Sequence, residues 1–456
     1  MEQVINIALS FKLATGEVTL NEIVYRLQEL QKELMLKTLK QIVMWYDDLI
    51  AERLSVQNHY SSRQRRGLGV HSRKGAGATS CPGRRAQKIG YRKTARKLKT
   101  VFGTLELPVR QMRCCRCGKK FSPLLSALKI GAYARRESNI EYAVTEAVID
   151  TNYRRLIEGR SIDISLGGVH NIVVGSDIDR VLEEPVDMSN LSAIMADGSG
   201  VKQKKGSKGE LRTVIGITHA GRVTPLGCFV NTQWADAEKI VRQRLRQDEN
   251  EKSRQCPIAF VYDGEPGLDG FLSDIAQSQR CTWHAPRGLY HALWQDGLKK
   301  KDSQPEMDRV KQLVGIELPG DDFELLQDSD KQAVRERYTS SKAEIKKLIE
   351  TFSAKGYTQG ATYLENLSRQ MFRHIEVWLE TGVIAPKATS LLERVFREIG
   401  RRLKRIAWGW SDKAVTNLSK MIMIRQYARG KWEHHWKEKL GINGFFEIQV
   451  QSVSIS

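Results

Sequence analysis

The chain has 456 residues, which is too many for one typical hydrophobic core, so we expect two or three domains. Its 41% hydrophobic and 28% charged residues are typical of a globular protein, and no apolar run is long enough to cross a membrane. The first residues lack the features of a secretory signal, and the seven cysteines are mostly scattered. Both observations lead us to expect a cytoplasmic protein rather than a disulfide scaffold.

Positive charge is concentrated in one stretch of the sequence. Residues 56–136 contain 21 Lys and Arg and one acid, Glu106, so they carry the whole net charge of +20. Such a local excess releases counterions from a phosphate backbone, whereas a solvated basic face would not concentrate its charge in this way. We therefore expect this stretch to bind nucleic acid, in a protein associated with the nucleoid. The residues that we assign to DNA contact are Arg84, Arg85, Lys88, Arg92, Lys93, Arg96, Lys97 and Lys99.

The first predicted element is a helix over Thr19–Ile50, within an N-terminal helical region, 1–55. Apolar residues recur there at alternating steps of three and four, at Leu20, Ile23, Leu27, Leu30 and Leu34. This spacing is compatible with a short coiled coil, and hence with a homodimer or higher oligomer on DNA. A helix packed on the rest of the same chain is an equally good interpretation.

A basic arm and a zinc-ribbon-like region are expected over residues 56–125. The segment Gln57–Gly90 is polar, basic and without periodicity, which predicts an arm that orders on its partner. The alternation of apolar residues over Thr100–Arg113 predicts a β-hairpin.

Cysteines around this hairpin suggest a possible structural Zn²⁺. Cys114 and Cys117 form a Cys-x₂-Cys-Gly knuckle, the usual half of a zinc ribbon, and Cys81 stands where the other half is expected. Arg84 occupies the place of the fourth cysteine, so a ribbon that has lost its metal is the alternative. The candidate ligands are Cys81, Cys114 and Cys117, with Cys115 or His71 as the fourth.

Residues 126–188 predict a helical region that contains a helix-turn-helix. Within the largely helical Ile140–Arg180, Tyr153–Leu156 leads through Gly159 to Ser165–Ile172. This arrangement would place residues near Ser165 in a DNA major groove, although two glycines weaken the second helix. The simpler interpretation of His170 is a packing residue.

From Ser192 the pattern changes to strands that alternate with helices, which predicts the first part of a catalytic core over residues 189–300. Three antiparallel strands, a helix and then further strands alternating with helices is the order of a ribonuclease-H-like α/β fold. In that topology the first and fourth strands are neighbours. The predicted strands are 194–197, 211–218, 223–230, 258–263 and 280–283, and the predicted helices are 234–246 and 267–277.

Two of these strands end in an aspartate followed by glycine, Asp197-Gly198 and Asp263-Gly264. Either one alone fits a turn, because Asp-Gly is a strong turn signal. Two carboxylates at the ends of neighbouring buried strands repel each other unless a cation lies between them. Because hard cations prefer oxygen ligands, the pair predicts a Mg²⁺ or Mn²⁺ site.

The segment Met307–Glu380 is almost all helical in pattern and predicts an all-helical insertion over residues 301–386, with breaks at Gln304-Pro305 and Ala385-Pro386. The core then closes over residues 387–430. An amphipathic helix is expected over Thr389–Ile399 and a last helix over Lys413–Tyr427, followed by a C-terminal tail, 431–456.

Glu393 is the candidate for a third acidic ligand. The alternative is a capping box, because Ser390-x-x-Glu393 stands at the predicted start of a helix. Glu398 lies five residues further on, off the face of Glu393, and is the weaker candidate.

Taken in order, four segments resemble the signature of Mutator-like DDE transposases from prokaryotic insertion sequences. These segments are Asp197-Gly198, Asp263-Gly264, Cys281-Thr282-Trp283-His284 and Thr389-Ser390-Leu391-Leu392-Glu393-Arg394. In that superfamily a Cys/Asp-x₂-His element and a helical domain stand between the second aspartate and the glutamate, as they do here. The basic segment with Thr100–Cys117 also resembles the upstream DNA-binding region. The likeness spans roughly Arg84–Tyr427, and Arg84 itself departs from the zinc-ribbon pattern.

The resemblance implies that Asp197, Asp263 and Glu393 are catalytic carboxylates that hold two Mg²⁺ or Mn²⁺ ions. It also implies that Cys281 and His284 form a positioning element and that His284 and Arg287 approach the scissile phosphate. By themselves, Cys281 fits a small core residue and the other two fit solvated side chains.

The function implied is that of a DNA transposase, which cleaves transposon ends and transfers the strands into target DNA. Its partners would be double-stranded terminal inverted repeats and target DNA, without a membrane. The alternatives are a ribonuclease-H-like nuclease or resolvase without strand transfer, and a domesticated DNA-binding protein that no longer cuts.

Overall fold

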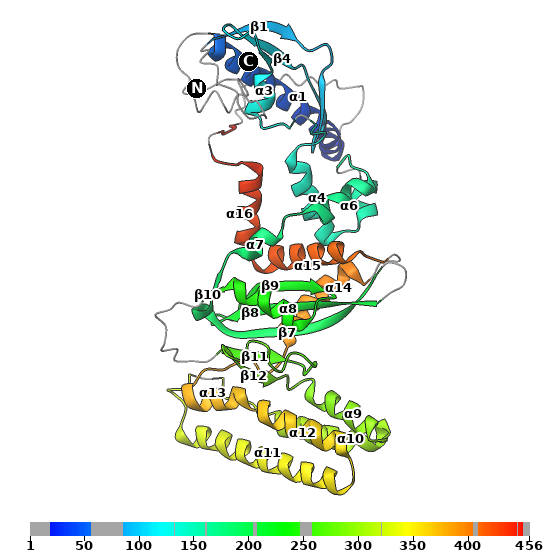
Figure 1. The fold of residues 1–456 in the computed structure, drawn as a ribbon, viewed down its shortest axis with the longest axis vertical. Helices are drawn as coiled ribbons and strands as arrows, with labels where there is room; N and C mark the ends of the chain where they lie inside the picture. Colours follow the sequence, from blue (N-terminus) through cyan, green and yellow to red (C-terminus); the bar gives the residue numbers. More distant parts are fainter. Residues whose placement is uncertain are drawn as a thin grey trace. The chain divides into compact units, whose positions relative to one another are not determined.

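The structure is a computed structural model of a mixed α/β protein. It describes residues 19–55, 85–131, 133–159, 162–203, 208–246, 258–320, 322–404, 409–444 and 446–449. The chain divides into two compact units, Met1–Ile172 and Val173–Ser456, which we call unit 1 and unit 2 (Figure 1). Across these described ranges, no helix is long and apolar enough to cross a membrane.

Unit 1 begins with the long helix α1, Leu20–Ser55, which confirms the predicted helix. Its C-terminal part packs on the strands of the unit through Val43, Ile50 and Leu54. Intramolecular packing therefore accounts for the second half of this helix. Of the predicted coiled-coil positions, Leu34 is half-buried and the others are exposed, namely Leu20, Ile23, Leu27 and Leu30.

The strands of unit 1 form two small sheets. In one, the hairpin of β2 and β3 is antiparallel, and in the other β4 lies between β1 and β5, also antiparallel. The bounds are β1 Ala86–Tyr91, β2 Arg96–Thr100, β3 Gly103–Leu107, β4 Arg110–Cys114 and β5 Lys120–Phe121, followed by the short helix α3, Pro123–Ala127.

The predicted hairpin over Thr100–Arg113 is wrong in its pairing. β3 and β4 both lie in this range, but each pairs with a strand that precedes it in the chain. Pro108, which lacks a backbone N–H, stands between them and favours the change of partner. The predicted arm is also shorter than expected, because β1 occupies its end. Residues 57–84 of that arm lie outside the described part of the chain.

A buried ion pair joins α1 to β4. Arg110 Nε lies 2.7 Å from Asp47 Oδ2, Arg110 also contacts Asp48, and its guanidinium lies 4.8 Å from the centre of the Tyr91 ring. Burial raises the pKa of Asp47, although the charge of Arg110 opposes the shift. The carboxylate therefore depends on this one arginine for its compensation.

Replacing Arg110 by Ala is expected to lower the free energy of unfolding of unit 1 by about 3–5 kcal/mol, because it leaves a buried carboxylate unpaired. Amide hydrogen exchange of α1 measures this loss. As a control, Glu29→Gln breaks the exposed pair with Arg26 on the same helix and should cost no more than about 0.5 kcal/mol. Equal effects of the two substitutions would contradict the prediction.

Helices complete unit 1 and lead into unit 2. They are α4 Ser138–Asp150, α5 Tyr153–Glu158, α6 Leu166–Gly175 and α7 Asp179–Glu183, which confirms the predicted helical region. Asn152 caps α5 by accepting a hydrogen bond from Arg155 N. Ser165 and Gly167 are exposed at the start of α6, and His170 is half-buried. Their contact with DNA remains a prediction.

A five-stranded sheet lies at the centre of unit 2, in the order β12-β11-β7-β8-β9 (Figure 1). β7, β8 and β9 are antiparallel neighbours, β11 is parallel to β7, and β12 is parallel to β11. Their bounds are β7 Leu191–Lys202, β8 Lys208–Thr218, β9 Val223–Val230, β11 Ile258–Tyr262 and β12 Ala276–Arg280. A separate two-stranded parallel pair is formed by β6 Val186–Asp187 and β10 Leu245–Arg246. The predicted first four strands are confirmed.

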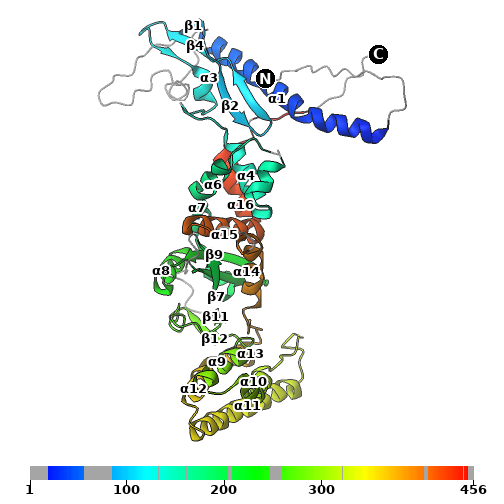
Figure 2. The same cartoon turned by 90° about the vertical axis from the view of Figure 1, so that its right-hand side faces the viewer.

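Helices cover both faces of this sheet. α8, Trp234–Arg244, lies on one face, and α14, Ser390–Leu403, lies on the opposite side with α15, Asp412–Tyr427 (Figure 2). A further helix, α16 Arg429–Leu440, follows α15, so the prediction that Tyr427 ends the last helix is wrong.

The predicted helix over 267–277 is wrong, and so is the predicted strand over 280–283. The chain forms successive turns up to Ile275 and enters β12 at Ala276. Gly267 and Leu272 have φ angles of +95° and +54°, which a right-handed helix does not allow. Phe271 instead stacks on Phe260 of the sheet at 5.1 Å.

A helical bundle separates β12 from α14. It comprises α9 Ala285–Gln295, α10 Lys300–Val314, α11 Asp328–Ala354, α12 Thr358–Gln370 and α13 Arg373–Thr381, and these helices share one buried core. Gln279 of β12 joins the bundle to the sheet by donating to Met371 O and accepting from His374 N, at 2.7 and 2.8 Å. Pro305 lies inside α10, so the predicted break at Gln304-Pro305 is wrong. The break near Ala385-Pro386 is confirmed.

Candidate active site

Asp197 and Asp263 are placed side by side by the register of two parallel strands. Ala196 of β7 is the partner of Tyr262 of β11, and each of these residues is followed by one of the aspartates. The two side chains therefore leave neighbouring strands at the same level, as the topology inferred from the sequence requires.

Alternation along the strands decides which face of the sheet the aspartates occupy. Ala196 and Tyr262 belong to the core under α8, so the next residue on each strand turns to the other face. On that face Asp197 lies opposite Thr213 of β8, and Thr213 in turn lies opposite Cys228 of β9. The Cys228 thiol contacts Met423 of α15 at 3.3 Å. The aspartates thus face the side covered by α14 and α15.

The Cys281-x-x-His284 element contacts the start of the helix that carries Glu393. Thr389, the residue that precedes α14, donates to Cys281 Sγ from both its backbone N and its Oγ1, at 3.4 Å each. Thr389 Oγ1 also lies 3.5 Å from His284 Nδ1. His284 Nε2 lies 3.6 Å from Glu393 Oε1. These contacts bring together residues that are more than a hundred positions apart in the chain.

The capping-box alternative for Glu393 is wrong. α14 begins after Thr389, and no side-chain hydrogen bond caps its start. The Glu393 side chain is half-exposed, and its carboxylate lies near His284 instead. Glu398, the weaker candidate, forms an ion pair with Arg401 at 2.7 Å.

The electrostatics of this cluster centre on Asp197, which is 7% exposed. Burial, and then the negative charge of Asp263, raise the pKa of Asp197 to about 7, with a smaller contribution from Glu393. The backbone N–H of Gly198, which donates to Asp197 Oδ1 at 2.7 Å, opposes the shift. A bound cation would stabilise the charged form of such a carboxylate, because it would offset both the cost of burial and the repulsion from the acidic neighbours.

His284 is a basic group beside this cluster, and its charge lowers the pKa of Asp197. Its hydrogen bond with Cys281 and the charges of Asp197 and Asp263 raise its pKa, although burial opposes them. Burial by itself would raise the pKa of the Cys281 thiol, but the hydrogen bonds from His284 and Thr389 lower it. Cys281 is thus a buried hydrogen-bond acceptor that holds His284 and α14 in place.

Arg287, the third residue of the predicted positioning group, lies exposed on the first turn of α9. It has no hydrogen bond or ion pair to any described residue.

No three His, Cys, Asp or Glu side chains among the described residues already form a group that could hold a metal ion. Asp197 and Asp263 come from the sheet and Glu393 from α14, and the carboxylates of Asp197 and Glu393 interact through their charges. Because half of the Glu393 side chain is exposed, it is free to change rotamer.

Glycine at position 264 is required by an arginine that sequence reasoning missed. Gly264 has a φ of +100°, and a Cβ there would lie 1.8 Å from the guanidinium of Arg280. Arg280 stacks over the Tyr262 ring at 5.2 Å, so it packs beneath the turn that carries Asp263. The only sequence signal for this contact is an arginine directly before Cys281.

Substituting Gly264→Ala is expected to destabilise unit 2 by about 3 kcal/mol, from the φ strain and from the displaced guanidinium. The matched control is Gly221→Ala, where φ is +71° but a Cβ would meet open space. That control should cost only about 1–2 kcal/mol, the backbone term alone. Chemical denaturation measures both, and equal costs would show that the Arg280 contact does not constrain this turn.

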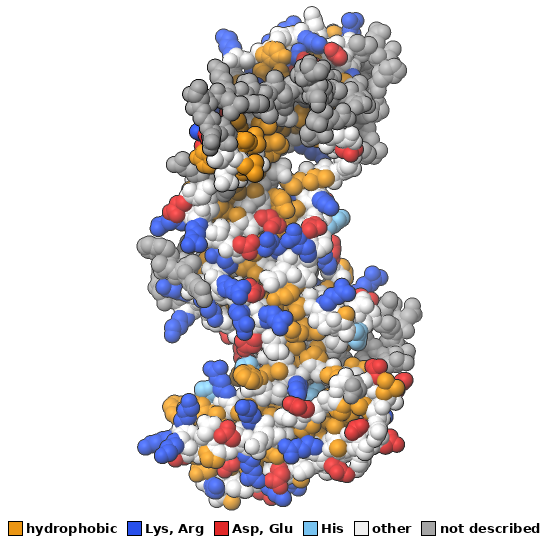
Figure 3. All heavy atoms as spheres, turned by 180° about the vertical axis from the view of Figure 1, so that it is seen from behind, with side chains coloured by type: hydrophobic (Ala, Val, Ile, Leu, Met, Phe, Trp, Pro, Cys, Tyr) orange, Lys and Arg blue, Asp and Glu red, His pale blue; other side chains and the backbone are white. Residues whose placement is uncertain are grey.

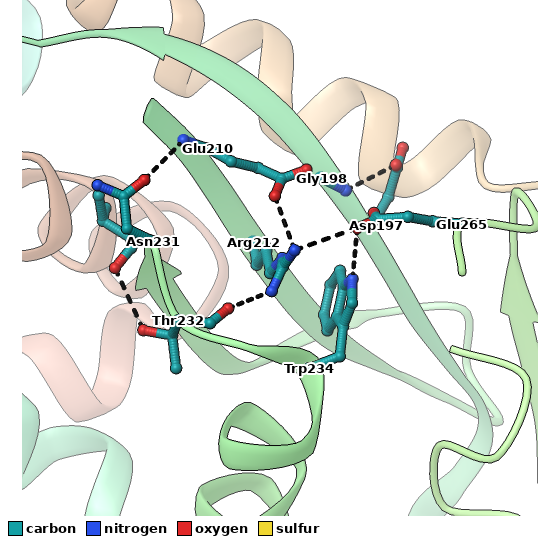
Figure 4. Close-up of polar contacts among 9 residues, drawn as sticks. Asp197, Gly198, Glu210, Arg212, Asn231, Thr232, Trp234 and Glu265 are labelled. Carbon is teal, nitrogen blue, oxygen red and sulfur yellow. Dashed lines mark hydrogen bonds and ion pairs between the residues drawn. The ribbon is translucent and has the colours of Figure 1, made fainter. Parts of the chain in front are cut away.

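A second network that sequence reasoning missed lies on the other face of β7, behind Asp197 (Figure 4). Arg212 forms ion pairs with Glu210 at 2.8 Å and with Glu265 at 3.4 Å. Trp234 Nε1 donates to Glu265 Oε1 at 2.7 Å, and Glu265 N donates to Asp263 Oδ1 at 2.8 Å. The network ties the Asp263 turn to α8 and to the middle of the sheet.

The cysteine knuckle of unit 1 has a tight turn. Gly118 N donates to Cys114 O at 2.9 Å, Cys114 N donates to Lys119 O at 3.0 Å, and Gly118 has a φ of +68°. Cys114 is buried, and Cys115 and Cys117 are exposed. Cys81 and Arg84 lie outside the described residues, so the zinc site stays a prediction.

The remaining predicted DNA contacts are Arg85, which directly precedes β1, and residues of β1, β2 and the turn between them. Lys97 pairs with Glu106 and Lys99 with Asp163, both at 2.9 Å, and Arg96 donates to backbone carbonyls of Gly131 and Ala134. Those with exposed side chains are Arg85, Lys88, Arg92, Lys93, Lys97 and Lys99. Their binding to DNA remains a prediction.

Comparison with protein-family models finds no match, and comparison with curated proteins finds none either.

The raised pKa of Asp197 predicts how the metal-free protein responds to pH. Between about pH 4 and pH 7 the folded state keeps a proton that the unfolded chain has lost, so this group weakens folding progressively as the pH rises through that window. Asp197→Asn should therefore raise the melting temperature more at about pH 8 than at about pH 5. The exposed Asp236→Asn is the control.

Mn²⁺ should raise the melting temperature of the native chain at about pH 8, and much less at about pH 5, because protons compete for the carboxylates. The Asp197→Asn variant should lose this response. A rise that is unaffected by the substitution would show that Asp197 is not a ligand.

Proposed function

We propose that this protein is a DNA transposase that cleaves transposon ends and transfers them into target DNA with the help of divalent cations. The observation that carries the proposal is the placement of Asp197 and Asp263 at matching positions of two adjacent parallel strands, on the face where Glu393 enters from α14. Three acids from distant parts of the chain are the ligand set that phosphoryl transfer with two metal ions requires.

The sheet order supports a ribonuclease-H-like core. Three consecutive antiparallel strands are followed by β11, which lies beside the first strand and parallel to it, and by β12, which lies beside β11 and parallel to it. The helical bundle between β12 and α14 supports the family resemblance, because it stands between the second aspartate and the glutamate. The contacts of Cys281 and His284 with Thr389 support a positioning role for the Cys-x-x-His element.

The donor set fits a hard cation, because carboxylate oxygens are the ligands that Mg²⁺ and Mn²⁺ prefer. Asp197, Asp263 and Glu393 would hold the ions, which when bound supply an activated water and charge neutralisation for an in-line displacement at phosphorus. Asp197 must give up its proton to act as a ligand. His284 would contribute positive charge beside Glu393, and the Cys281 and Thr389 contacts would keep it oriented.

Unit 1 would supply DNA affinity. The exposed cations of β1, β2 and their connecting turn would contact phosphates of the terminal inverted repeats or of target DNA, and the cysteine knuckle would be half of a structural zinc ribbon. The exposed heptad positions of α1 would serve a homodimer or higher oligomer on DNA. A cytoplasmic location on the nucleoid belongs to the same proposal.

The decisive experiment measures cleavage of DNA from the ends of the encoding element in Mg²⁺ or Mn²⁺. Asp197→Asn, Asp263→Asn and Glu393→Gln should each reduce cleavage by about 100-fold or more, since losing even a residue that only hydrogen-bonds a metal ligand costs about 10–100-fold. Binding of the same DNA in EDTA should change little. Glu398→Gln, on the same helix as Glu393, is the matched control and should cleave normally.

If the Asp197→Asn variant still cleaves DNA, the pair of Asp197 and Asp263 does not hold the catalytic ions. Joining of the freed 3′ ends into a plasmid separates a transposase from the second candidate, a nuclease or resolvase of the same fold. DNA binding without any metal-dependent cleavage would favour a protein that no longer cuts.

A further inference from the structure

Two tryptophans of unit 2 are exposed to an unusual degree. Trp283 is 76% exposed and Trp294 is 62% exposed, whereas every other described tryptophan is buried or half-buried. Trp is a large apolar side chain that normally gains stability from burial. Their exposure is therefore a feature that the fold itself does not require.

The two tryptophans follow the helical spacing of α9, with Trp294 on the helix and Trp283 in the turn just before it. This helix buries Leu289 and Leu293 in the core of the bundle. Arg287, His291 and Trp294 follow at steps of four and three on its exposed side, and Trp283 precedes Arg287 by four residues. We call these four residues, Trp283, Arg287, His291 and Trp294, the α9 stripe. Its ends are about three helical turns apart, or about 16 Å along the axis.

The α9 stripe carries one arginine, and residues 283–295 contain no Asp or Glu. The next residue in the sequence that is acidic is Asp296, which accepts hydrogen bonds from the backbone N–H groups of Gln359 and Gly360, at 3.0 and 2.7 Å, and so caps α12. Arg287 forms no ion pair with the described residues, and the exposed run 299–301 that follows α9 consists of lysines.

Several other cations of the bundle are paired with carboxylates. Arg309 and Lys347 both contact Glu344, and Lys342 contacts Glu376. On the face of unit 2 drawn in Figure 3, basic and acidic side chains are likewise interspersed. The α9 stripe therefore combines two exposed aromatic rings with an arginine that has no ion pair among the described residues, and aromatic rings with a nearby cation are the combination that binds single-stranded nucleic acid.

The α9 stripe begins at the candidate active site. Trp283 directly precedes His284, whose ring lies 3.6 Å from Glu393. The neighbouring residue Thr282 is held by a hydrogen bond from its backbone N to Lys387 O at 2.9 Å, so this turn is attached to the segment that leads into α14.

We propose that the α9 stripe binds unpaired nucleotides of a DNA strand next to the cleavage site, with bases stacked on Trp283 and Trp294 and phosphates beside Arg287. Bases in an intact duplex are stacked on one another and leave no face for an indole ring, so the surface selects DNA with unpaired nucleotides. The inference rests on the proposed function, because that function makes DNA the partner. It adds a feature of the substrate, unpaired nucleotides, that the three carboxylates would not recognise.

The test compares three labelled DNAs, a short single strand, a blunt duplex and the same duplex with an unpaired flap, by fluorescence anisotropy with the full chain in EDTA. Trp283→Ala and Trp294→Ala should each weaken binding of the single strand and the flap by about 5- to 150-fold, the usual loss for one stacked base. Binding of the blunt duplex should stay within about twofold, since it depends on phosphate contacts. Trp283→Phe should keep most of the affinity.

Two variants serve as controls. Leu325→Ala removes another exposed apolar side chain of the same bundle, and Arg335→Ala removes an exposed cation of α11. Both should bind all three DNAs normally. Arg287→Ala should weaken binding of the single strand and reduce the slope of log affinity against log salt by about one.

Equal losses on blunt duplex and single strand would overturn the inference, because they would indicate general phosphate binding. A change of oligomeric mass by light scattering, with normal DNA binding, would overturn it in favour of a second copy as the partner. Metal-dependent cleavage by the native chain, lost in Asp197→Asn, is read separately, so the inference can fail while the proposed function stands.

Discussion

The parallel pairing of β7 with β11 is the constraint on which the candidate active site depends. It places Asp197 and Asp263 on adjacent strands and on the same face, where two negative charges oppose each other in a buried setting. An isolated protein stabilises such a pair only by keeping a proton on it, which is why burial and Asp263 raise the pKa of Asp197 to about 7. A divalent cation would replace that proton, and its attraction to both carboxylates would outweigh their mutual repulsion.

Much of the surrounding structure holds these two residues in place. On the face away from the aspartates, Arg212, Glu265 and Trp234 tie the Asp263 turn to α8. On the aspartates' own side, Thr389 joins α14 to the Cys281-x-x-His284 element. The helical bundle is attached to the outer strand β12 through Gln279, so a long insertion can enter the chain without displacing Glu393 from the cluster.

The successes and errors of sequence reasoning have physical causes. The strands β7, β8, β9 and β11 were predictable because each contains a short apolar run bounded by turn residues, and the helix α14 was predictable because its apolar residues recur at helical spacing. The helix expected over 267–277 failed because Gly267 and Leu272 adopt positive φ angles, and packing on Phe260 stabilises the irregular turns. The hairpin in unit 1 failed because strand pairing is a choice among neighbours, and alternation within a strand does not name its partner. The Arg280 contact with Gly264 left almost no trace in the sequence.

By itself, the sequence determined the two Asp-Gly strand ends, their neighbouring topology, the long helical interruption and the concentration of positive charge between residues 56 and 136. These features are local or periodic, so they can be recognised without knowing what packs against them. Only the tertiary structure decided that Glu393 forms no capping box and lies beside His284, and that Thr389, before α14, contacts Cys281. It also decided that Trp283 and Trp294, just before and on α9, stay exposed. Each of those outcomes depends on contacts between residues far apart in the chain, or on the absence of such contacts among the described residues, and no local pattern encodes them.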